Sequence, residues 1–315
     1  MTKIFIPSYH RPYNLKTVKY FHRIGWNMSD IYVFIDDEGG DKHDYEKIQQ
    51  EYGFNLVEFS IKEARERYDY VHRPSPSMRS AGQARNMFQD YAIGNGIDFY
   101  CVIDDDTTDY QVKRHWKYIR RAKLTDITKT FDEIETFMRD RHIGLFGLPQ
   151  TGDAVSEHLY LYRRKVMNTT FYLMPYLYRG ERGVQDDDTS LFSCVNNEGY
   201  FTGSLADGLC LLQTGSAQAE GGLTDLYHEC RLLNKALVCP IQFPSAIHAE
   251  KQPMNGARIH HKTNNRYLCP KILKSTNGRD NVAWDTYEED VPFTNEPKRI
   301  NNYVNKHLSA SNEAF

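Results

Sequence analysis

The sequence predicts an α/β fold in which a mixed, mostly parallel sheet is flanked by helices. Short apolar runs alternate with helical stretches up to about residue 143, which is the pattern of strands joined by crossover helices. Gly25 and Gly53 follow two of these helical stretches, as expected of residues that end helices. Beyond residue 143 strand and helix signals mix, so we also expect a C-terminal extension.

Apolar periodicity defines the elements of the first half. The expected strands are Lys3–Pro7, Ile31–Ile35, Asn55–Phe59 and Phe99–Ile103. The expected helices are Pro12–Ile24, Tyr45–Tyr52 and Ala81–Ala92. Ligands of parallel sheets sit beyond the carboxyl ends of the strands, so the side chains after these strands are the first candidates for a site.

The second half has weaker signals. We expect a strand over Ile143–Pro149, a hairpin of Leu159–Arg164 with Thr169–Met174, and helices over Thr189–Val195 and Gly222–Leu237. No repeat or low-complexity linker divides the chain. We therefore predict a catalytic domain over residues 1–240 and an extension over residues 241–315.

Composition restricts the function classes. The net charge of −3 over 315 residues argues against a globally basic nucleic-acid binder, so such a surface must be local. No apolar run has membrane-spanning length and no signal-peptide core is present, so we expect a cytoplasmic protein with no membrane partner. Cysteines without a CxxC pair predict reduced core thiols. They are Cys101, Cys194, Cys210, Cys230, Cys239 and Cys269.

Three successive carboxylates, Asp104, Asp105 and Asp106, directly follow the apolar strand Phe99–Ile103. Negative charge at the end of a core strand is unfavourable unless a cation lies nearby. Mg²⁺ and Mn²⁺ prefer carboxylate oxygens and can carry a diphosphate on their open positions. A solvated turn is the alternative, because Asp is common in turns.

Two segments near the N-terminus suit a nucleoside. Ile6–Pro12 places Ser8 and main-chain N–H groups between a strand and a helix, although a plain turn explains the same residues. Asp36 and Asp37 end the second strand and can accept hydrogen bonds from a nucleobase N–H or ribose hydroxyls. A solvated turn is again the alternative.

The segment Met78–Asn86 brings Arg79, Arg85 and Asn86 to the start of a helix. Cationic and amide groups there can hold a diphosphate or a sugar hydroxyl, helped by the positive end of the helix. A surface arginine is the alternative interpretation.

A second acidic cluster, Asp186 to Asp188, precedes a short apolar helix within Gly183–Phe192. Acids at a helix start are ordinary caps. Transfer to a hydroxyl, however, needs a carboxylate near the attacking oxygen, and this cluster offers a general base that need not bind metal.

Taken in order, these motifs resemble the glycosyltransferases of the GT-A fold over about residues 3–215. Asp104–Asp106 is similar to their DXD metal motif, and Arg85-Asn86 resembles their donor-contacting ARN element. Gln185–Leu191 resembles the acidic "EDxDxxL" element that supplies the base in inverting members. Gln185 stands where Glu is usual, and the base is ambiguous between Asp186 and Asp187.

The resemblance implies a Rossmann-like sheet, a nucleotide-sugar donor (a UDP-sugar) and Mn²⁺ or Mg²⁺ bound by Asp104 and Asp106. A histidine from the C-terminal part would be a third ligand. His248, His260 and His261 are the candidates, His260 or His261 is favoured, and His261 is taken as the ligand. The extension would close over the donor. The implied donor contacts are Pro7, Ser8, Tyr9, Arg11, Asp36, Arg79, Arg85, Asn86 and Asp105.

A narrower resemblance is to the phage TET-associated and 5-hydroxymethylpyrimidine-DNA glycosyltransferases, which implies 5-hydroxymethylcytosine in phage DNA as the acceptor. An acid-free segment, Gln111–Lys123, supports a polyanionic acceptor because it interleaves cations with aromatic rings. Its expected DNA contacts are Lys113, Arg114, Trp116, Lys117, Arg120 and Arg121.

A second acid-free stretch is Lys251–Arg279. Both stretches are also compatible with solvated basic faces. A polysaccharide or protein acceptor, or a non-catalytic nucleic-acid-binding protein on the same scaffold, are the remaining alternatives.

Overall fold

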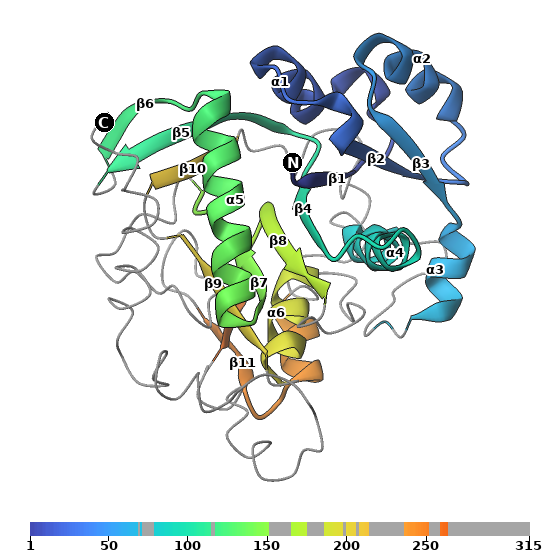
Figure 1. Ribbon diagram of the computed structural model, residues 1–315. Coiled ribbons are helices and arrows are strands. Elements are labelled where there is room, and N and C mark those ends of the chain that lie inside the picture. The colour runs from blue at the N-terminus through green and yellow to red at the C-terminus, as the bar shows by residue number, and fades with distance from the viewer. Residues whose placement is uncertain are drawn as a thin grey trace.

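The computed structural model describes residues 1–68, 70, 79–114, 117–150, 165–174, 186–197, 200–205, 208–213, 236–251 and 259–263. Within these ranges the predicted mixed, mostly parallel sheet is confirmed (Figure 1). Its seven strands run in the order β3-β2-β1-β4-β8-β7-β9. They are β1 (Lys3–Pro7), β2 (Ile31–Asp36), β3 (Asn55–Phe59), β4 (Phe99–Ile103), β7 (Ile143–Gly147), β8 (Thr169–Leu173) and β9 (Phe201–Ser204).

Strands β3, β2, β1 and β4 are parallel to one another, which is the strand order of half a Rossmann-like sheet. Strand β8 is antiparallel to both of its neighbours, β4 and β7, and makes the sheet mixed. Both edges of β8 are thus paired within the sheet. The other half of the predicted hairpin, residues 159–164, lies outside the described residues.

Helices cover both faces of the sheet, because its buried strands are apolar on both sides. Ile4 and Ile6 of β1 pack with α1 (Lys16–Ile24), α2 (Lys42–Tyr52) and α5 (Leu124–Arg141) on one face. Phe5 between them packs with α4 (Ala81–Gly94) and α6 (Asp187–Asn197) on the other. The alternation along β1 therefore separates two hydrophobic cores.

Two smaller antiparallel sheets flank the main one. Strands β5 (Thr107–Arg114), β6 (Lys117–Arg121) and β10 (Gly208–Gln213) form a three-stranded sheet with the order β10-β5-β6. Strands β11 (Ile247–Lys251) and β12 (Ile259–Thr263) form a pair. The sequence prediction lacked β5, β6, α5 and the short helix α3 (Ile61–Arg67). These segments are rich in charged residues, which weakens the apolar periodicity on which such predictions depend.

The predicted helix over Pro12–Ile24 is wrong in its first turn. Pro12–Asn14 is a 3₁₀ turn, Leu15 leaves the helical region with φ −73° and ψ 75°, and α1 begins at Lys16. The reason is tertiary, because the backbone N–H of Thr17 donates to the carbonyl of Asp105 and directs the start of α1 towards β4.

Other predictions fall partly or wholly outside the described residues. The helix predicted over Gly222–Leu237 is described only at its last two residues, which belong to a helical segment over 236–242. The role of residues 241–315 as an extension closing over the donor remains a prediction. Four described cysteines, Cys101, Cys194, Cys210 and Cys239, are buried and form no disulfide, as expected. None of the helices in the described ranges is both long and apolar enough to cross a membrane.

Candidate functional site

The carboxyl ends of β1, β2 and β4 meet at one edge of the main sheet, because the three strands are adjacent and parallel. Ser8 follows β1, Asp36 closes β2, and Asp104–Asp106, here named the acidic turn, follows β4. The structure thus brings three predicted parts of the site to a single edge. It is the edge at which open α/β sheets bind their ligands.

Asp104 shares a guanidinium with the second acidic cluster. Nη2 of Arg85 on α4 donates to Oδ1 of Asp104 at 3.1 Å, and Nη1 of the same side chain donates to Oδ2 of Asp187. Burial raises the pKa of Asp104 to about 6, with Arg85 opposing the shift and the nearby carboxylates of Asp106 and Asp187 reinforcing it. Additional positive charge at this point would therefore stabilise the ionised acidic turn.

Asp105 is held by the loop that follows β1. Arg11 Nη1 donates to its Oδ1 at 3.1 Å, and the Ser8 hydroxyl donates to its Oδ2 at 2.9 Å. The Ser8 hydroxyl also lies 2.7 Å from the Tyr45 hydroxyl of α2. Burial raises the pKa of Asp105, against the effects of Arg11 and Ser8. Three residues predicted to contact the nucleotide thus bind one another.

Asp106 carries a buried carboxylate oxygen that is not hydrogen-bonded. Its side chain belongs to a residue 8% exposed, and Oδ1 contacts no donor among the described residues. Burial and the neighbouring Asp105 raise its pKa, whereas Arg11 and Lys16 lower it. A buried oxygen without a donor is costly unless a cation approaches it. The Oδ1 atom of Asp106 fits a hard divalent metal ion, and the metal-binding role of Asp104 and Asp106 remains a prediction.

Among the described residues, no preformed cluster of side chains supplies the remaining ligands of such an ion. The part of the chain that the structure describes contains no group of three or more His, Cys, Asp or Glu arranged to hold a metal. His248 lies on β11 with its ring 3.7 Å from Glu250 and mostly exposed. His260 and His261 lie on β12, and their side chains are outside the described set. The metal-binding role of His261 remains a prediction.

The second acidic cluster lies at the start of α6. Asp187 is the first residue of that helix and is linked to the acidic turn through Arg85, whereas Asp188 pairs with Lys165 at 3.0 Å. Asp186 has a φ of 53°, a left-handed conformation that is strained for a residue other than glycine. Strain of this kind collects at functional sites. Asp186 and Asp187, both buried, stay candidate bases.

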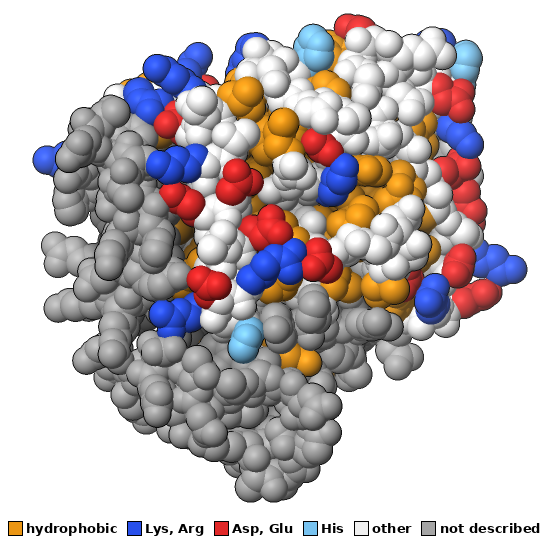
Figure 2. Space-filling view, in the orientation of Figure 1, with side chains coloured by type: hydrophobic (Ala, Val, Ile, Leu, Met, Phe, Trp, Pro, Cys, Tyr) orange, Lys and Arg blue, Asp and Glu red, His pale blue; other side chains and the backbone are white. Residues whose placement is uncertain are grey.

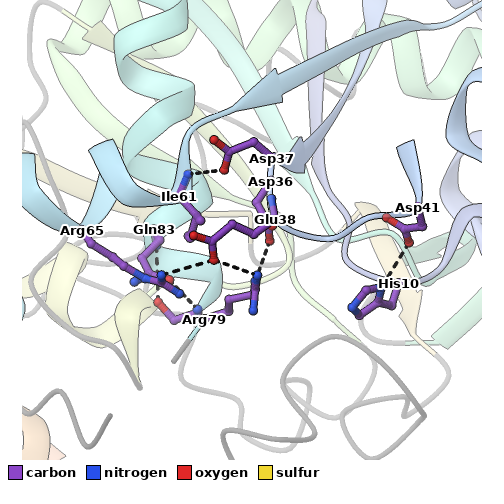
Figure 3. A network of polar contacts seen from close by, with 10 residues as sticks. His10, Asp36, Asp37, Glu38, Asp41, Ile61, Arg65, Arg79 and Gln83 are labelled. Carbon is purple, nitrogen blue, oxygen red and sulfur yellow. Dashed lines mark hydrogen bonds and ion pairs between the residues drawn. The ribbon is translucent and has the colours of Figure 1, made fainter. Parts of the chain in front are cut away.

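A third group of charges lies at the ends of β2 and β3 (Figure 3). Arg79 donates from Nε to Asp36 at 2.9 Å and from Nη2 to Glu38 at 3.2 Å. Figure 3 shows its side chain between these two acids, with Arg65 of α3 on the other side of Glu38. The Arg79 guanidinium also lies 5.0 Å from the centre of the Tyr9 ring. Tyr9, Asp36 and Arg79, three of the residues predicted to contact the donor, thus lie close to one another.

Glu38 and Arg65 were missed by sequence reasoning. Glu38 directly follows Asp36-Asp37, where no motif marks it, and Arg65 lies in the unpredicted helix α3. The Asp36 carboxylate also accepts from the backbone N–H of Glu38 at 3.0 Å, which shapes this turn. Only the position of α3 in the fold connects Arg65 with the others.

Two other predicted donor contacts are placed differently. Asn86 is fully buried in α4, where its Nδ2 donates to the Tyr70 hydroxyl at 3.0 Å. Pro7 is the last residue of β1 and pairs with Phe34. Their contact with a donor remains a prediction.

Thr17 is the contact to the acidic turn that the sequence did not reveal. It is fully buried in the first turn of α1. Its hydroxyl donates to the carbonyl of Asp104 and accepts from the N–H of Thr107 at 3.0 Å, while its own N–H donates to the Asp105 carbonyl at 3.2 Å. No motif marks this residue, because the bonds join segments 87 and 90 positions apart.

The predicted DNA-contacting segment, Gln111–Lys123, forms the second half of β5 and all of β6. Figure 2 shows Lys and Arg side chains gathered in the region where Figure 1 places these two strands. Lys117 and Tyr118 of β6 are exposed, the tyrosine by 56%. Trp116 and the side chain of Arg114 lie outside the described residues.

Two acids that flank the segment, Asp109 and Asp126, neutralise part of this charge. Arg120 makes two hydrogen bonds to Asp126, at 2.6 and 2.8 Å, and Arg121 pairs with Asp109 at 3.0 Å. Lys113 and Lys117 have no ion pair with a described residue. The basic surface is therefore smaller than the sequence suggested.

No protein-family model and no curated protein matches this sequence. Among solved structures, the chain is similar to glucosyl-3-phosphoglycerate synthase from Mycobacterium tuberculosis, with 11% identity and a TM-score of 0.42 over 84% of this chain and 86% of that chain. Its complex with Mn²⁺ and UDP-glucose matches at 10% identity, with the same coverage and score. A cytidylyltransferase from Leptospira borgpetersenii matches at 12% identity and a TM-score of 0.31, over 55% of this chain and 60% of that chain. Similarity at this level does not establish a shared activity.

Proposed function

We propose that this chain is a metal-dependent glycosyltransferase that moves a sugar from a nucleotide-sugar, a UDP-sugar, to a hydroxyl group. One observation carries the proposal: beyond the carboxyl ends of the parallel strands, Asp104 of the acidic turn faces a second carboxylate, Asp187, across one arginine, and Asp105 and Asp106 beside it are buried. This arrangement leaves negative charge that a divalent metal ion would balance, and it keeps a separate acid nearby for proton transfer.

Each part of the site has a role in this proposal. Asp104 and Asp106 would hold Mn²⁺ or Mg²⁺, which would supply charge stabilisation for the departing diphosphate. Asp36 would accept from the base or ribose, and Arg79, next to the Tyr9 ring, would support it. These residues orient the donor at the sheet edge.

The reaction requires a base. The acceptor oxygen would form a bond to the anomeric carbon while the bond from that carbon to the diphosphate oxygen breaks, and UDP would leave. The proton of the acceptor hydroxyl would pass to Asp186 or Asp187. Asp187 is the one joined to Asp104 through Arg85, and Asp186 is the one with the strained backbone.

For the acceptor we propose 5-hydroxymethylcytosine in phage DNA, modified in the host cytoplasm. The narrower motif resemblance supports it, and so do the exposed Lys117 and Tyr118 of β6, which offer a phosphate contact and a stacking surface. Because Arg120 and Arg121 pair with acids, DNA binding would depend on few cations. The affinity for DNA would therefore fall only slowly as the salt concentration rises.

The test is incubation of the purified chain with Mn²⁺, a panel of UDP-sugars and duplex DNA, with mass spectrometry of the digested nucleosides. We expect a hexose or pentose on hydroxymethylcytosine and none on matched cytosine DNA. Hydrolysis of a UDP-sugar without transfer to DNA would redirect the acceptor to a polysaccharide or protein. Tight, metal-independent DNA binding without any turnover would replace the enzyme by a binding protein.

Variants of the second acidic cluster test the base. Asp186→Asn and Asp187→Asn each remove a proton acceptor with little change in shape, and loss of the base costs about 10²- to 10⁴-fold in rate. Asp188→Asn is the matched control, because Asp188 pairs with Lys165 instead of Arg85. Full activity in both of the first two variants would reject this cluster as the base.

A further inference from the structure

Thr17 joins α1 to the acidic turn by three hydrogen bonds, and all three end on backbone atoms. Its hydroxyl accepts from the N–H of Thr107, directly after the turn, and donates to the carbonyl of Asp104, the first residue of the turn. Its own N–H donates to the carbonyl of Asp105, the second residue of the turn. A single buried residue thus binds the backbone at two of the three aspartates and directly after them.

The side-chain hydroxyl is required for two of these bonds. Only serine and threonine place a short group with one donor and a free acceptor at this position. The bonds are shielded from solvent, because Thr17 and Thr107 are both fully buried. Loss of the hydroxyl would leave the Thr107 N–H without its acceptor, and such a group distorts its surroundings to find another.

Position matters here because the acidic turn carries mutually repelling charges. Asp104 and Asp106 lie two residues apart. The carboxylate of Asp106 raises the pKa of Asp104, and the carboxylate of Asp105 raises the pKa of Asp106. Their side chains remain directed by the backbone only if that backbone does not relax away from the repulsion. Thr17 opposes such relaxation through the backbone, because its bonds to Asp104 and Asp105 end on their carbonyl oxygens and not on their carboxylates.

We infer that Thr17 is a positioning residue of the metal site: its hydroxyl sets the backbone of the acidic turn so that the Asp104 and Asp106 carboxylates converge on one divalent cation. This inference rests on the proposed function, since it assumes that the turn binds a metal. Residues that orient metal ligands without touching the ion affect metal affinity by about 10- to 100-fold.

The test is a titration of the full chain with Mn²⁺ in the presence of UDP, followed by the electron paramagnetic resonance of free Mn²⁺. Thr17→Val keeps the shape and removes the hydroxyl, and we expect its Mn²⁺ dissociation constant to rise at least about tenfold. Thr17→Ser restores the hydroxyl and is expected to bind like the natural chain. Thr130→Val, at a buried threonine of α5 with no bond to the acidic turn, is the control and should leave Mn²⁺ binding unchanged.

The controls separate the two ideas. The double variant Asp104→Asn, Asp106→Asn should lose the Mn²⁺ site, and binding that survives it would overturn the proposed metal site itself. If that variant loses Mn²⁺ while Thr17→Val binds as tightly as the natural chain, only the role of Thr17 fails.

If the Thr17→Val variant does not fold, a second variant and a second measurement still test the inference. Thr17→Ala removes the hydroxyl without placing a methyl group against the Asp104 carbonyl, and it should show the same loss. In the natural chain, Mn²⁺ with UDP should slow hydrogen exchange at the Thr107 N–H. An exchange rate that does not respond to Mn²⁺ would contradict a coupling between this bond and the metal site.

Discussion

Arg85 of α4 and Asp104 at the end of β4 form an ion pair of 3.1 Å, across 19 residues of sequence. The same guanidinium reaches Asp187 at the start of α6, so a single cation joins elements from three parts of the chain. Its side chain is only 12% exposed, which reduces screening by water. The pair is therefore sensitive to substitution and to any cation that competes with Arg85 for Asp104.

Substitution of Arg85 should destabilise the metal-free protein. Arg85→Met leaves Asp104 and Asp187 as partly buried carboxylates without this cation, and removal of one partner of such a group costs about 2–4 kcal/mol. Urea unfolding at neutral pH measures the loss. We expect Mn²⁺ to recover part of it, because the ion supplies the missing charge at Asp104.

The matched control for that experiment is Arg139→Met. Arg139 of α5 also joins two acids, Asp98 and Glu135, but its side chain is 40% exposed. Exposed pairs contribute about 0–1 kcal/mol. Equal losses in the two variants would contradict the role given to burial at Arg85.

Asp104→Asn should change stability with a defined pH dependence. The pKa of Asp104 in the folded chain is about 6, above its ordinary value of 3.8, so the folded state binds the proton more tightly than the unfolded chain does. Stability from this group is complete below about pH 4 and is lost as the pH rises through about 6. The neutral amide avoids that loss, and the metal-free variant should exceed the natural chain by at most about 3 kcal/mol at about pH 8.

The two pH limits are measured by chemical unfolding in the presence of a chelator. Below about pH 4 the difference between Asp104→Asn and the natural chain should disappear. Asp98→Asn is the control with the opposite sign, because Arg139 holds the pKa of Asp98 below its ordinary value. At pH values above the pKa of Asp98, the Asp98→Asn variant should be less stable than the natural chain. A gain in stability there would refute the electrostatic argument.

Glu133→Gln on α5 should stabilise the protein away from the site. Burial raises the pKa of Glu133 to about 7, and its Oε2 contacts no hydrogen-bond donor in the described ranges. The stability contributed by the protonated acid is present below about pH 4.5 and is lost as the pH rises through about 7. Glu133 is only partly buried, so screening by water reduces the effect of its shifted pKa on stability. We expect a gain of about 1–2 kcal/mol at about pH 8 and none at about pH 4, with unchanged transfer activity. A gain that is independent of pH would exclude titration of Glu133 as its cause.

Gly147→Ala should destabilise the main sheet at β7, the strand next to its edge strand β9. A Cβ atom at this position of β7 would lie 2.7 Å from Cγ1 and 2.8 Å from Cβ of Val166. Overpacking of this kind costs about 1–3 kcal/mol. Gly94→Ala is the control, because a Cβ there meets no atom within 4 Å and should stabilise the end of α4 by up to about 1 kcal/mol. Thermal unfolding distinguishes the two signs.

The parts of the fold that the sequence predicted are those with local signals. Apolar runs located β1 to β4, and the three aspartates after β4 marked the site, because a cluster of charge beside a buried strand is visible without any structure. The strand β5 could not be predicted in the same way. Its alternation places Val112 in the core between the polar residues Gln111 and Lys113, and its partner β10 comes nearly 100 residues later.

The sequence by itself determined the strands β1 to β4, the helices α1, α2 and α4, the acidic turn and the charged residues near it, since each depends on residue type and short spacing. Tertiary structure alone decided which of those charges meet. In the folded chain Arg85 bonds both Asp104 and Asp187, and Arg11 and Ser8 bond Asp105. Arg120 pairs with Asp126, and Thr17 bonds the backbone of the acidic turn. The physical reason is that an ion pair or hydrogen bond forms over about 3 Å in space, whereas the packing of the sheet that brings its partners together spans the whole chain.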